Sequence, residues 1–191
     1  MKYCQKEDIN IIVEALERGQ VLVLPTDTVY GLSCLANNSK AIRKIYRIKK
    51  RARNKPFLVL VKSFCMLKKY FFISARQNKF LHTIWNNNKT PITIISKSRK
   101  LLAPEMAFAN ANSARLPNDD FLIKIIKLVG VPLVSTSLNI SGQPEITEID
   151  NLEKYFIDAK PDLIVGGGKS KKKSSKIIDI NDIDNLKIIR K

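Results

Sequence analysis

Histidine and cysteine are scarce in this chain of 191 residues. His82 is the only histidine, which argues against serine–histidine catalytic triads and against zinc sites with several histidine ligands. It lies in an expected helix, residues 76–85, where a packing role is the simpler one. The three cysteines, Cys4, Cys34 and Cys65, lack metal-ligand spacing, so we expect reduced thiols, with Cys34 and Cys65 as small core residues.

Long apolar runs are also missing. The first eight residues contain no apolar segment that could serve as a signal peptide, and the apolar stretches elsewhere have the length of a strand, far short of a membrane span. No linker rich in Gly, Pro or Ser divides the chain, and 45% hydrophobic residues suffice for one sizeable core. We therefore predict a single cytoplasmic domain over residues 1–191, without membrane contact.

Carboxylates are absent from a long interval of the chain. Between Asp27 and Glu105 there is no Asp or Glu, although the interval holds 18 Lys and Arg residues. The remainder has 16 basic and 17 acidic residues, so the net charge of +17 arises in this one interval. Such one-sided charge favours a polyanionic ligand, such as a nucleotide triphosphate, RNA or both.

The densest part of this interval is residues 43–55, where eight of thirteen side chains are cationic. Helical spacing predicts a buried stripe made of Ile42, Ile45, Tyr46 and Ile48 or Lys49. The cations then gather at the C-terminal end of that helix and in the loop behind it, where they are electrostatically favoured. Taken alone, a solvated basic face explains the segment equally well.

Short apolar runs that alternate with amphipathic segments predict an α/β fold. The run at 20–24 shows no polar alternation, which is typical of a strand buried on both faces by helices. Further strands are expected at 57–61, 91–95, 112–117, 131–134, 162–165, 176–180 and 186–190. Besides the basic helix, helices are expected at 9–18, capped by Asp8, at 65–71 and 76–85, and between the cap Asp119 and Gly130.

Two loops rich in hydroxyl groups follow buried strands of this expected sheet. Residues 25–32 (Pro-Thr-Asp-Thr-Val-Tyr-Gly-Leu) follow the strand at 20–24, and residues 135–142 (Ser-Thr-Ser-Leu-Asn-Ile-Ser-Gly) follow the strand at 131–134. In open α/β sheets ligands bind beyond the carboxyl ends of strands, so these two loops could converge on one ligand. For the first loop alone, a Pro-led turn with a local Asp hydrogen bond is the alternative.

Gly168-Lys169-Ser170 does not satisfy the phosphate-binding P-loop motif. That motif needs a glycine five residues before Gly168, where Leu163 stands, and a helix after it, where a lysine run follows. We therefore expect no P-loop in this chain.

Four separated segments stand together in an informative order and spacing. They are residues 25–32, Lys49-Lys50-Arg51 with Lys55-Pro56, Arg115-Leu116-Pro117, and residues 135–142. Together they resemble the YrdC family of threonylcarbamoyl-AMP synthases, and the resemblance runs from about residue 8 to residue 190. It implies a single-domain, twisted open mixed α/β sheet with helices on its faces and a concave basic cavity, in the short form of the family that lacks a C-terminal extra domain.

The resemblance also implies an enzyme, a nucleotidyltransferase that acts as L-threonylcarbamoyladenylate synthase. Such an enzyme joins L-threonine, bicarbonate and ATP into threonylcarbamoyl-AMP and releases pyrophosphate. Partner tRNA-modification proteins then move the threonylcarbamoyl group to the adenosine beside the anticodon. The expected cofactor is Mg²⁺, bound mainly through the ATP phosphates, with no tightly bound organic cofactor. Attack on an α-phosphate depends on positioning and charge stabilisation, which suits a cationic site without histidine.

By the same resemblance, ten residues would form the site. Those expected to bind ATP are Lys49, Arg51, Lys55, Ser137, Asn139 and Arg190. Those expected to surround threonine are Thr28, Arg115, Ser135 and Ser175. Arg115 is suited to a bidentate pair with the threonine carboxylate. Each residue also has a plainer interpretation, as a capping hydroxyl or a surface cation.

The sequence departs from the family pattern near the expected threonine pocket. Leu60 stands where many members have histidine, Ala111 and Glu145 replace small hydroxyl residues, and residues 86–91 keep only the last proline of a Trp-Pro-Gly-Pro motif. A relative that acts on another carbamoyl compound therefore stays open as an alternative.

A non-catalytic RNA-binding module is the other alternative. It would grip tRNA or ribosomal RNA through the basic region 40–100, although aromatic residues are not interleaved with the cations in a recognisable RNA motif. Direct binding of tRNA or other RNA by the synthase itself also stays open.

Overall fold

The computed structural model describes residues 1–86, 90–106, 111–167 and 174–190. Within these ranges ten strands form one sheet in the order β1-β8-β2-β3-β7-β4-β6-β5-β9-β10. The strands are β1 (Lys2–Cys4), β2 (Leu22–Leu24), β3 (Gly31–Leu35), β4 (Leu58–Leu60), β5 (Ile92–Lys97), β6 (Ala111–Arg115), β7 (Leu133–Ser137), β8 (Leu163–Val165), β9 (Lys176–Asp179) and β10 (Lys187–Arg190). The helices are α1 (Ile9–Glu17), α2 (Ser39–Ile48), α3 (Phe64–Tyr70), α4 (Ala75–Asn86) and α5 (Asp120–Val129), with short 3₁₀ turns η1 (Pro104–Met106) and η2 (Leu152–Lys154).

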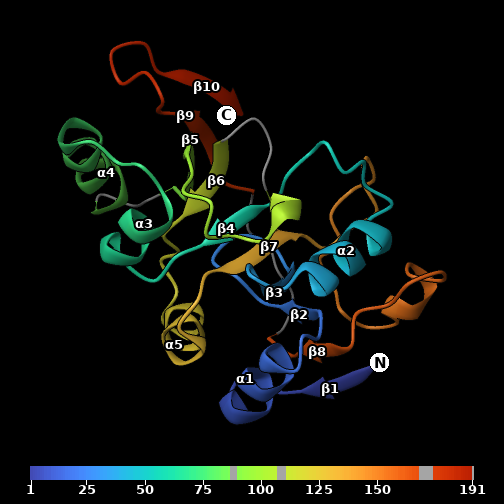
Figure 1. Cartoon of the computed structure of the whole chain (residues 1–191). Helices are drawn as coiled ribbons and strands as arrows, with labels where there is room; N and C mark the ends of the chain where they lie inside the picture. The colour runs from blue at the N-terminus through green and yellow to red at the C-terminus, as the bar shows by residue number, and fades with distance from the viewer. Residues whose placement is uncertain (87–89, 107–110, 168–173, 191) are drawn as a thin grey trace.

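The sheet is mixed, as predicted. β1 and β2 pair in parallel with β8, β4 with β6, and β5 with β9, whereas the remaining neighbours are antiparallel. In Figure 1 the sheet runs from β1 at the bottom to β10 at the top, with α3, α4 and α5 on its left and α2 on its right. Helices thus lie along both sides of the strands, in agreement with the expected fold class.

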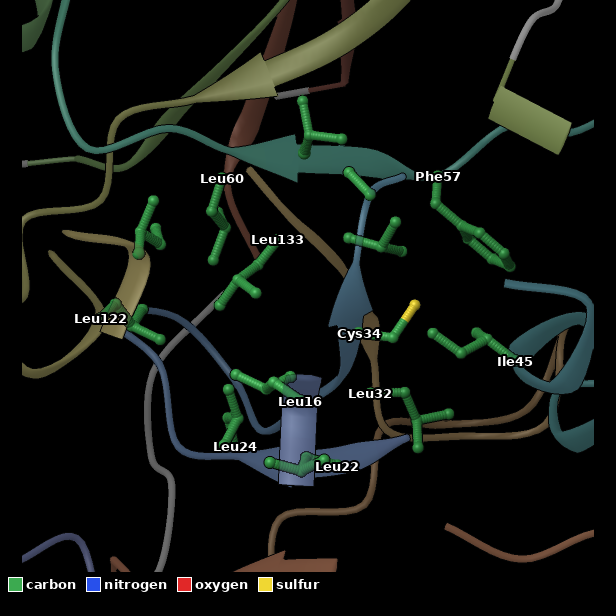
Figure 2. Packing of buried hydrophobic residues seen from close by; sticks show 14 of the residues in the cluster. Leu16, Leu22, Leu24, Leu32, Cys34, Ile45, Phe57, Leu60, Leu122 and Leu133 are labelled. Carbon is green, nitrogen blue, oxygen red and sulfur yellow. The ribbon is translucent and has the colours of Figure 1, made fainter. Parts of the chain in front are cut away.

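The centre of the sheet is apolar on both faces. All three residues of β2 are fully buried, which confirms the prediction for the run at 20–24. Both α1 and α2 contact β3, so helices cover the middle strands. Figure 2 shows labelled side chains of this core: Leu16, Leu22, Leu24, Leu32, Cys34, Ile45, Phe57, Leu60, Leu122 and Leu133. Burying each large aliphatic side chain contributes roughly 1.5 to 3 kcal/mol, so this cluster dominates the stability of the fold.

Helix α2 carries the basic segment toward the sheet. Its first turn is capped by Asn38, whose side chain accepts a hydrogen bond of 2.9 Å from the backbone N–H of Ala41. The predicted stripe is buried, and both alternatives at its end hold, since Ile48 and Lys49 are each only 2% exposed. The burial of Lys49 matters most, because a lysine ammonium is buried only where it finds hydrogen-bond acceptors.

Some local expectations are confirmed and others are wrong. Asp119 caps α5 through a 3.0 Å hydrogen bond from Leu122 N–H, and Gly130 ends that helix with a φ of 72°. His82 packs against the Phe64 ring at a centroid distance of 3.9 Å, as expected for a packing role. Cys65, however, is exposed rather than part of the core, because it lies on the outer side of α3.

Two further corrections concern segment ends. Asp8 does not cap α1, because its carboxylate accepts instead from the backbone N–H of Gln5 at 2.8 Å.

The strands β1 and β3 were missed. β3 begins inside the loop predicted at 25–32, since Gly31 and Leu32 pair with β2 and β7 rather than staying in a turn. A five-residue strand without alternation gives no periodic signal of its own.

The P-loop interpretation of Gly168-Lys169-Ser170 lies outside the described residues, as do positions 87–89 of the loop at 86–91. None of the helices within the described ranges has the length and apolar character needed to cross a membrane.

Candidate active site

A cavity of about 170 Å³ opens between β3, β4, β6 and β7, close to the start of β9 and the end of β10. Seven of the ten predicted site residues line this cavity: Thr28, Arg51, Arg115, Ser135, Ser137, Ser175 and Arg190. The two polar loops at 25–32 and 135–142 therefore meet, as predicted. They meet because β3 pairs with β7 in antiparallel register, which places Gly31 opposite Ser137.

The first loop is held by a hydroxyl pair. Thr26 Oγ1 lies 2.9 Å from Thr28 Oγ1, donates to the carbonyl of Val29 at 2.7 Å and accepts from the N–H of Thr28 at 3.0 Å. These contacts of Thr26 hold Thr28 in position. Sequence reasoning did not single out Thr26, although it lies inside the motif.

Arg115 is the most deeply placed cation of the cavity. It is 2% exposed, and its Nη1 donates to Thr28 Oγ1 at 3.0 Å. Its Nη2 lies 3.0 Å from Asp27 Oδ1, an ion pair by distance that is not aligned as a hydrogen bond. Burial lowers the pKa of Arg115, and the Asp27 carboxylate opposes that effect. The pair keeps the guanidinium charged at the cavity wall.

Donor capacity remains on this guanidinium. Within the described residues, the buried Nε of Arg115 has no hydrogen-bond partner. Among the described residues, the Asp27 carboxylate pairs with Arg115 and accepts from the N–H of Asn118 at 3.3 Å. These contacts join Asp27 to distant parts of the chain, in contrast to the local Asp hydrogen bond of the alternative interpretation. The arrangement suits an anionic group that approaches Arg115 from the cavity.

The opposite wall comes from the end of the chain. Arg190 of β10 donates from Nε and Nη2 to the carbonyl of Ser175, at 2.9 and 2.7 Å. The hydroxyl of Ser175 lies 2.7 Å from Thr93 Oγ1 on β5. Nothing in the sequence marked Thr93 as a site residue, because it occupies an ordinary position in an apolar strand.

Arg51 enters the cavity from the loop after α2. Its Nε donates to the carbonyl of Lys55 at 2.9 Å and its Nη2 to that of Pro56 at 3.3 Å, while its guanidinium lies 5.3 Å from the centre of the Phe57 ring. Burial lowers the pKa of Arg51. Lys55 itself is exposed and does not line the cavity. Only the backbone carbonyl of Lys55 contributes to the site, because it accepts the hydrogen bond from Arg51 Nε.

Lys49 lies behind the cavity wall rather than on it. Its ammonium donates to the carbonyl of Ser137 at 2.5 Å, to the carbonyl of Asn139 at 3.1 Å and to Asn139 Oδ1 at 2.5 Å. These three bonds use all three donors of the ammonium. Its own carbonyl accepts from the N–H of Ser141 at 2.8 Å. Lys49 therefore fastens the end of α2 to the loop at 135–142.

Asn139 belongs to the same junction. Its Oδ1 accepts from the hydroxyl of Ser137 at 2.9 Å, and its Nδ2 donates to the carbonyl of Gln143 at 2.6 Å. Burial, and then the charge of Arg51, lower the pKa of Lys49 to about 7, with Glu145 opposing them. The structure thus brings Lys49 and Asn139 together, but neither lines the cavity.

The sequence of residues 14–191 matches the family model Sua5/YciO/YrdC, which carries the description "Telomere recombination". The match covers most of the chain. This chain belongs to the Sua5/YciO/YrdC family. The predicted resemblance is therefore confirmed at the level of the family.

Sequence relatives cover from 74% to 93% of this chain. A Methanocaldococcus jannaschii protein named "Putative threonylcarbamoyl-AMP synthase" is 32% identical over 179 residues, which are 93% of this chain and 83% of the relative. The Escherichia coli K12 protein named "Uncharacterized protein YciO" is 29% identical over 181 residues, 93% of this chain and 86% of the relative. A Vibrio vulnificus threonylcarbamoyl-AMP synthase is 28% identical over 143 residues, 74% of this chain and 77% of the relative.

Solved structures of the family share the fold. The E. coli YciO crystal structure superposes with a TM-score of 0.85 at 25% identity and covers 100% of this chain and 94% of YciO. The crystal structure of P. abyssi Sua5 complexed with L-threonine gives a TM-score of 0.80 at 23% identity, over 93% of this chain and 53% of Sua5. The chain thus spans about half of Sua5, and at this identity the likeness concerns the fold.

Proposed function

We propose that this protein is an L-threonylcarbamoyladenylate synthase that forms threonylcarbamoyl-AMP and pyrophosphate from L-threonine, bicarbonate and ATP. The observation that carries the proposal is the convergence of Thr28 and Arg115 with Arg51 and Arg190 on one cavity. Two of the relatives above carry the name of this enzyme, which supports the same assignment. The product would serve threonylcarbamoyladenosine modification of tRNA in the cytoplasm, through partner modification proteins.

The threonine end of the cavity would be the wall around Arg115. Its guanidinium is buried, charged and fixed by Asp27, so it suits the threonine carboxylate. The hydroxyls of Thr28 and Ser135 line the same wall and would accept from the substrate amine or bond its hydroxyl. Holding the amino acid rigidly would present its nitrogen to the carbon of bicarbonate, where a C–N bond would form and water would leave to give the carbamate.

The nucleotide end would be the wall around Arg51 and Arg190. The carbamate oxygen would attack the α-phosphorus of ATP, the bond from that phosphorus to the α,β-bridging oxygen would break, and pyrophosphate would leave with the electron pair on that oxygen. Arg51 and Arg190 line the cavity and would stabilise the charge that develops on the phosphates. Ser137 lines the cavity beside them and would contact the nucleotide, on a loop that Lys49 and Asn139 keep in place.

Magnesium would reach this site on the nucleotide. Among the described residues no three His, Cys, Asp or Glu side chains gather where they could hold a metal ion, so the ATP phosphates would be its main ligands. When bound there, Mg²⁺ would neutralise phosphate charge.

Two of the departures from the family pattern can be placed relative to the cavity. Leu60 is fully buried and does not line it. Glu145 accepts a hydrogen bond from the hydroxyl of Ser174, which does line it. The inward arginines favour an enzyme over a non-catalytic RNA-binding module, which would not need a polar cavity of this kind.

The test is a reaction of the purified protein with L-threonine, bicarbonate, ATP and Mg²⁺. We expect release of pyrophosphate that depends on threonine, and a product whose mass equals that of threonylcarbamoyl-AMP. Omission of bicarbonate and replacement of threonine by valine are the controls. Pyrophosphate release that is indifferent to threonine would remove the substrate assignment, and no pyrophosphate under any of these conditions would remove the reaction.

A further inference from the structure

A second group of cations lies away from the cavity, beyond the end of β5. A hollow of about 740 Å³ is lined there by Phe72, Lys97, Ser98, Arg99, Lys100 and Leu101, which we call the β5-end platform. None of these residues lines the cavity described above. Since a strand rises about 3.3 Å per residue, Lys97 lies on the order of 13 Å along β5 from Thr93 at the cavity. The platform is therefore a separate surface.

The centre of the platform is a stack of two flat groups. The Phe72 ring is 50% exposed, and the Arg99 guanidinium lies 4.3 Å from its centroid. Arg99 is held in place, because its Nε donates to the carbonyl of Lys68 at 3.2 Å and its backbone N–H to the carbonyl of Tyr70 at 2.7 Å. The backbone N–H of Phe72 donates to the carbonyl of Lys97 at 2.9 Å. The stack is therefore preorganised rather than a chance contact of loose side chains.

The cations around this stack are exposed and unpaired. Lys97, Arg99 and Lys100 line the hollow, and Lys68 and Lys69 form the last turn of α3 beside it. In the part of the chain that the structure describes, none of the five joins an ion pair.

The neighbouring strand β9 carries Asp179, whose carboxylate accepts from the backbone N–H of Asn181 at 2.9 Å and from its Nδ2 at 2.7 Å. Asn181 Oδ1 in turn accepts from the N–H of Lys97 at 3.0 Å. Among the described residues Asp179 forms no ion pair with the platform cations, so their positive charge favours an external polyanion.

We propose that the β5-end platform binds unpaired RNA, with a base stacked on Phe72 and Arg99 and the neighbouring phosphates on Lys97 and Lys100. A flat aromatic and guanidinium surface ringed by cations is the combination that single strands use, because every base has a π-face and every nucleotide a phosphate. A duplex hides its bases, and an acidic peptide would use the cations but not the ring. RNA presents its bases in loops and unpaired ends, so it is the partner that fits. The inference does not rest on the synthase reaction.

The first test is fluorescence anisotropy of an RNA hairpin with an unpaired loop, titrated with the full chain. We expect Phe72→Ala to weaken binding about 5- to 150-fold, the range that loss of one base–aromatic stack gives, and Phe72→Tyr to bind like wild type. Tyr155→Ala is the matched control, since Tyr155 is also exposed, at 54%, but lies outside the platform. Phe72→Ala binding as tightly as wild type, or Tyr155→Ala weakening binding to the same extent, would overturn the proposal.

The second test separates the platform from general positive charge. Lys97→Ala with Lys100→Ala is compared with Lys124→Ala with Lys127→Ala on α5, so the net charge changes equally. Both α5 lysines are exposed and join no ion pair among the described residues. We expect the slope of log affinity against log salt to fall by about 1.4 for the platform pair and to stay constant for the α5 pair. Equal falls would show that any surface charge suffices and would contradict the proposal.

Two further measurements complete the design. A fully paired RNA of the same length and a polyglutamate chain serve as competitors, and we expect neither to displace the hairpin as well as unlabelled hairpin does. Displacement by polyglutamate at equal charge concentration would reduce the platform to a general anion surface. Threonine-dependent pyrophosphate release by Phe72→Ala should equal that of wild type, so failure of the RNA proposal is read independently of the proposed reaction.

Discussion

The cavity and the β5-end platform both carry cations from the same carboxylate-free stretch of sequence, yet the structure treats these cations in opposite ways. At the cavity, Arg51 is held by two backbone carbonyls, and behind the cavity wall Lys49 is held by three acceptors. On the platform, Lys97 and Lys100 are exposed and join no ion pair among the described residues. Buried, directed cations suit one small ligand in one orientation, whereas exposed ones suit a long polyanion with salt-dependent affinity.

The comparison predicts its largest effect at the buried pair of Arg115 and Asp27. Arg115→Met should lower the free energy of unfolding by about 3 to 5 kcal/mol, because it leaves the Asp27 carboxylate buried without its counter-charge. Threonine-dependent activity should be lost as well. Urea unfolding of Arg115→Met measures the loss, and the double variant with Asp27→Asn should recover most of the stability without recovering activity. A single variant as stable as wild type would show that the pair is not buried.

Lys49 should show the next largest effect. Lys49→Met should destabilise the protein by about 3 kcal/mol at pH 6, since buried acceptors that lose their donor cost roughly 1 to 3 kcal/mol each. The exposed neighbour Lys50, which pairs with Asp158 at 2.8 Å on the surface, provides the control, and Lys50→Ala should change stability by less than about 0.5 kcal/mol. Equal effects of both substitutions would show that Lys49 does not hold the end of α2 to the loop at 135–142.

The same residue makes a signed prediction about pH. The folded-state pKa of Lys49 is lowered to about 7 from 10.5, so the unfolded chain binds more protons than the folded one between these pH values. The contribution of Lys49 to stability must therefore rise with pH across this window, by up to about 1.4 kcal/mol per pH unit. Unfolding curves at pH 7 and pH 9 should show a smaller rise in Lys49→Met than in wild type. A rise of the same size in both proteins would contradict the lowered pKa.

Arg51 should affect binding rather than stability. Arg51→Ala should weaken ATP binding by about 1.5 to 3 kcal/mol, the range for a hydrogen bond to a charged group, and leave the thermal midpoint nearly unchanged. Calorimetric titration of ATP into Arg51→Ala and Lys50→Ala separates a cavity cation from its exposed neighbour. Equal affinities of the two variants would place Arg51 outside the nucleotide site.

The smallest effect is expected on the platform. Lys100→Ala should change the free energy of unfolding by less than about 0.5 kcal/mol, because the side chain is exposed and makes no ion pair in the described part of the chain. Thermal unfolding of Lys100→Ala and of Arg115→Met under the same conditions compares the exposed cation with the buried one. A loss above 1 kcal/mol, far outside the roughly 0.5 kcal/mol of ordinary surface changes, would mean that the platform cations hold the fold together.

Periodicity and capping in the sequence were enough to predict much of the framework. The stripe of Ile42, Ile45 and Tyr46 placed one face of α2 against the core, and Asp119 and Gly130 marked both ends of α5. β3 was missed because a short, uniformly buried strand has no period of its own and is defined by its neighbours β2 and β7. The mixed order of the sheet likewise depends on pairings between distant segments.

For the site, the family resemblance predicted ten residues, and seven of them line one cavity. Five of the seven lie in the four ordered motifs, whereas Ser175 and Arg190 lie outside them. The sequence did not predict which of these side chains point into the cavity. Lys49 and Arg51 are two residues apart and equally charged, yet Arg51 lines the cavity while Lys49 is buried behind it. Which of them turns inward depends on where the end of α2 meets the loop at 135–142, and only folding sets that distance.

The sequence by itself therefore determined the amphipathic helices, the buried central strand at 20–24, the concentration of charge between Asp27 and Glu105, and membership of the family. These properties depend on residue type and local spacing, which are written along the chain. The tertiary structure alone decided that Asp27 pairs with Arg115 and that Arg99 stacks on Phe72. Both contacts join residues far apart in the chain. They form because the pairing of strands in the sheet sets the distance between their backbones.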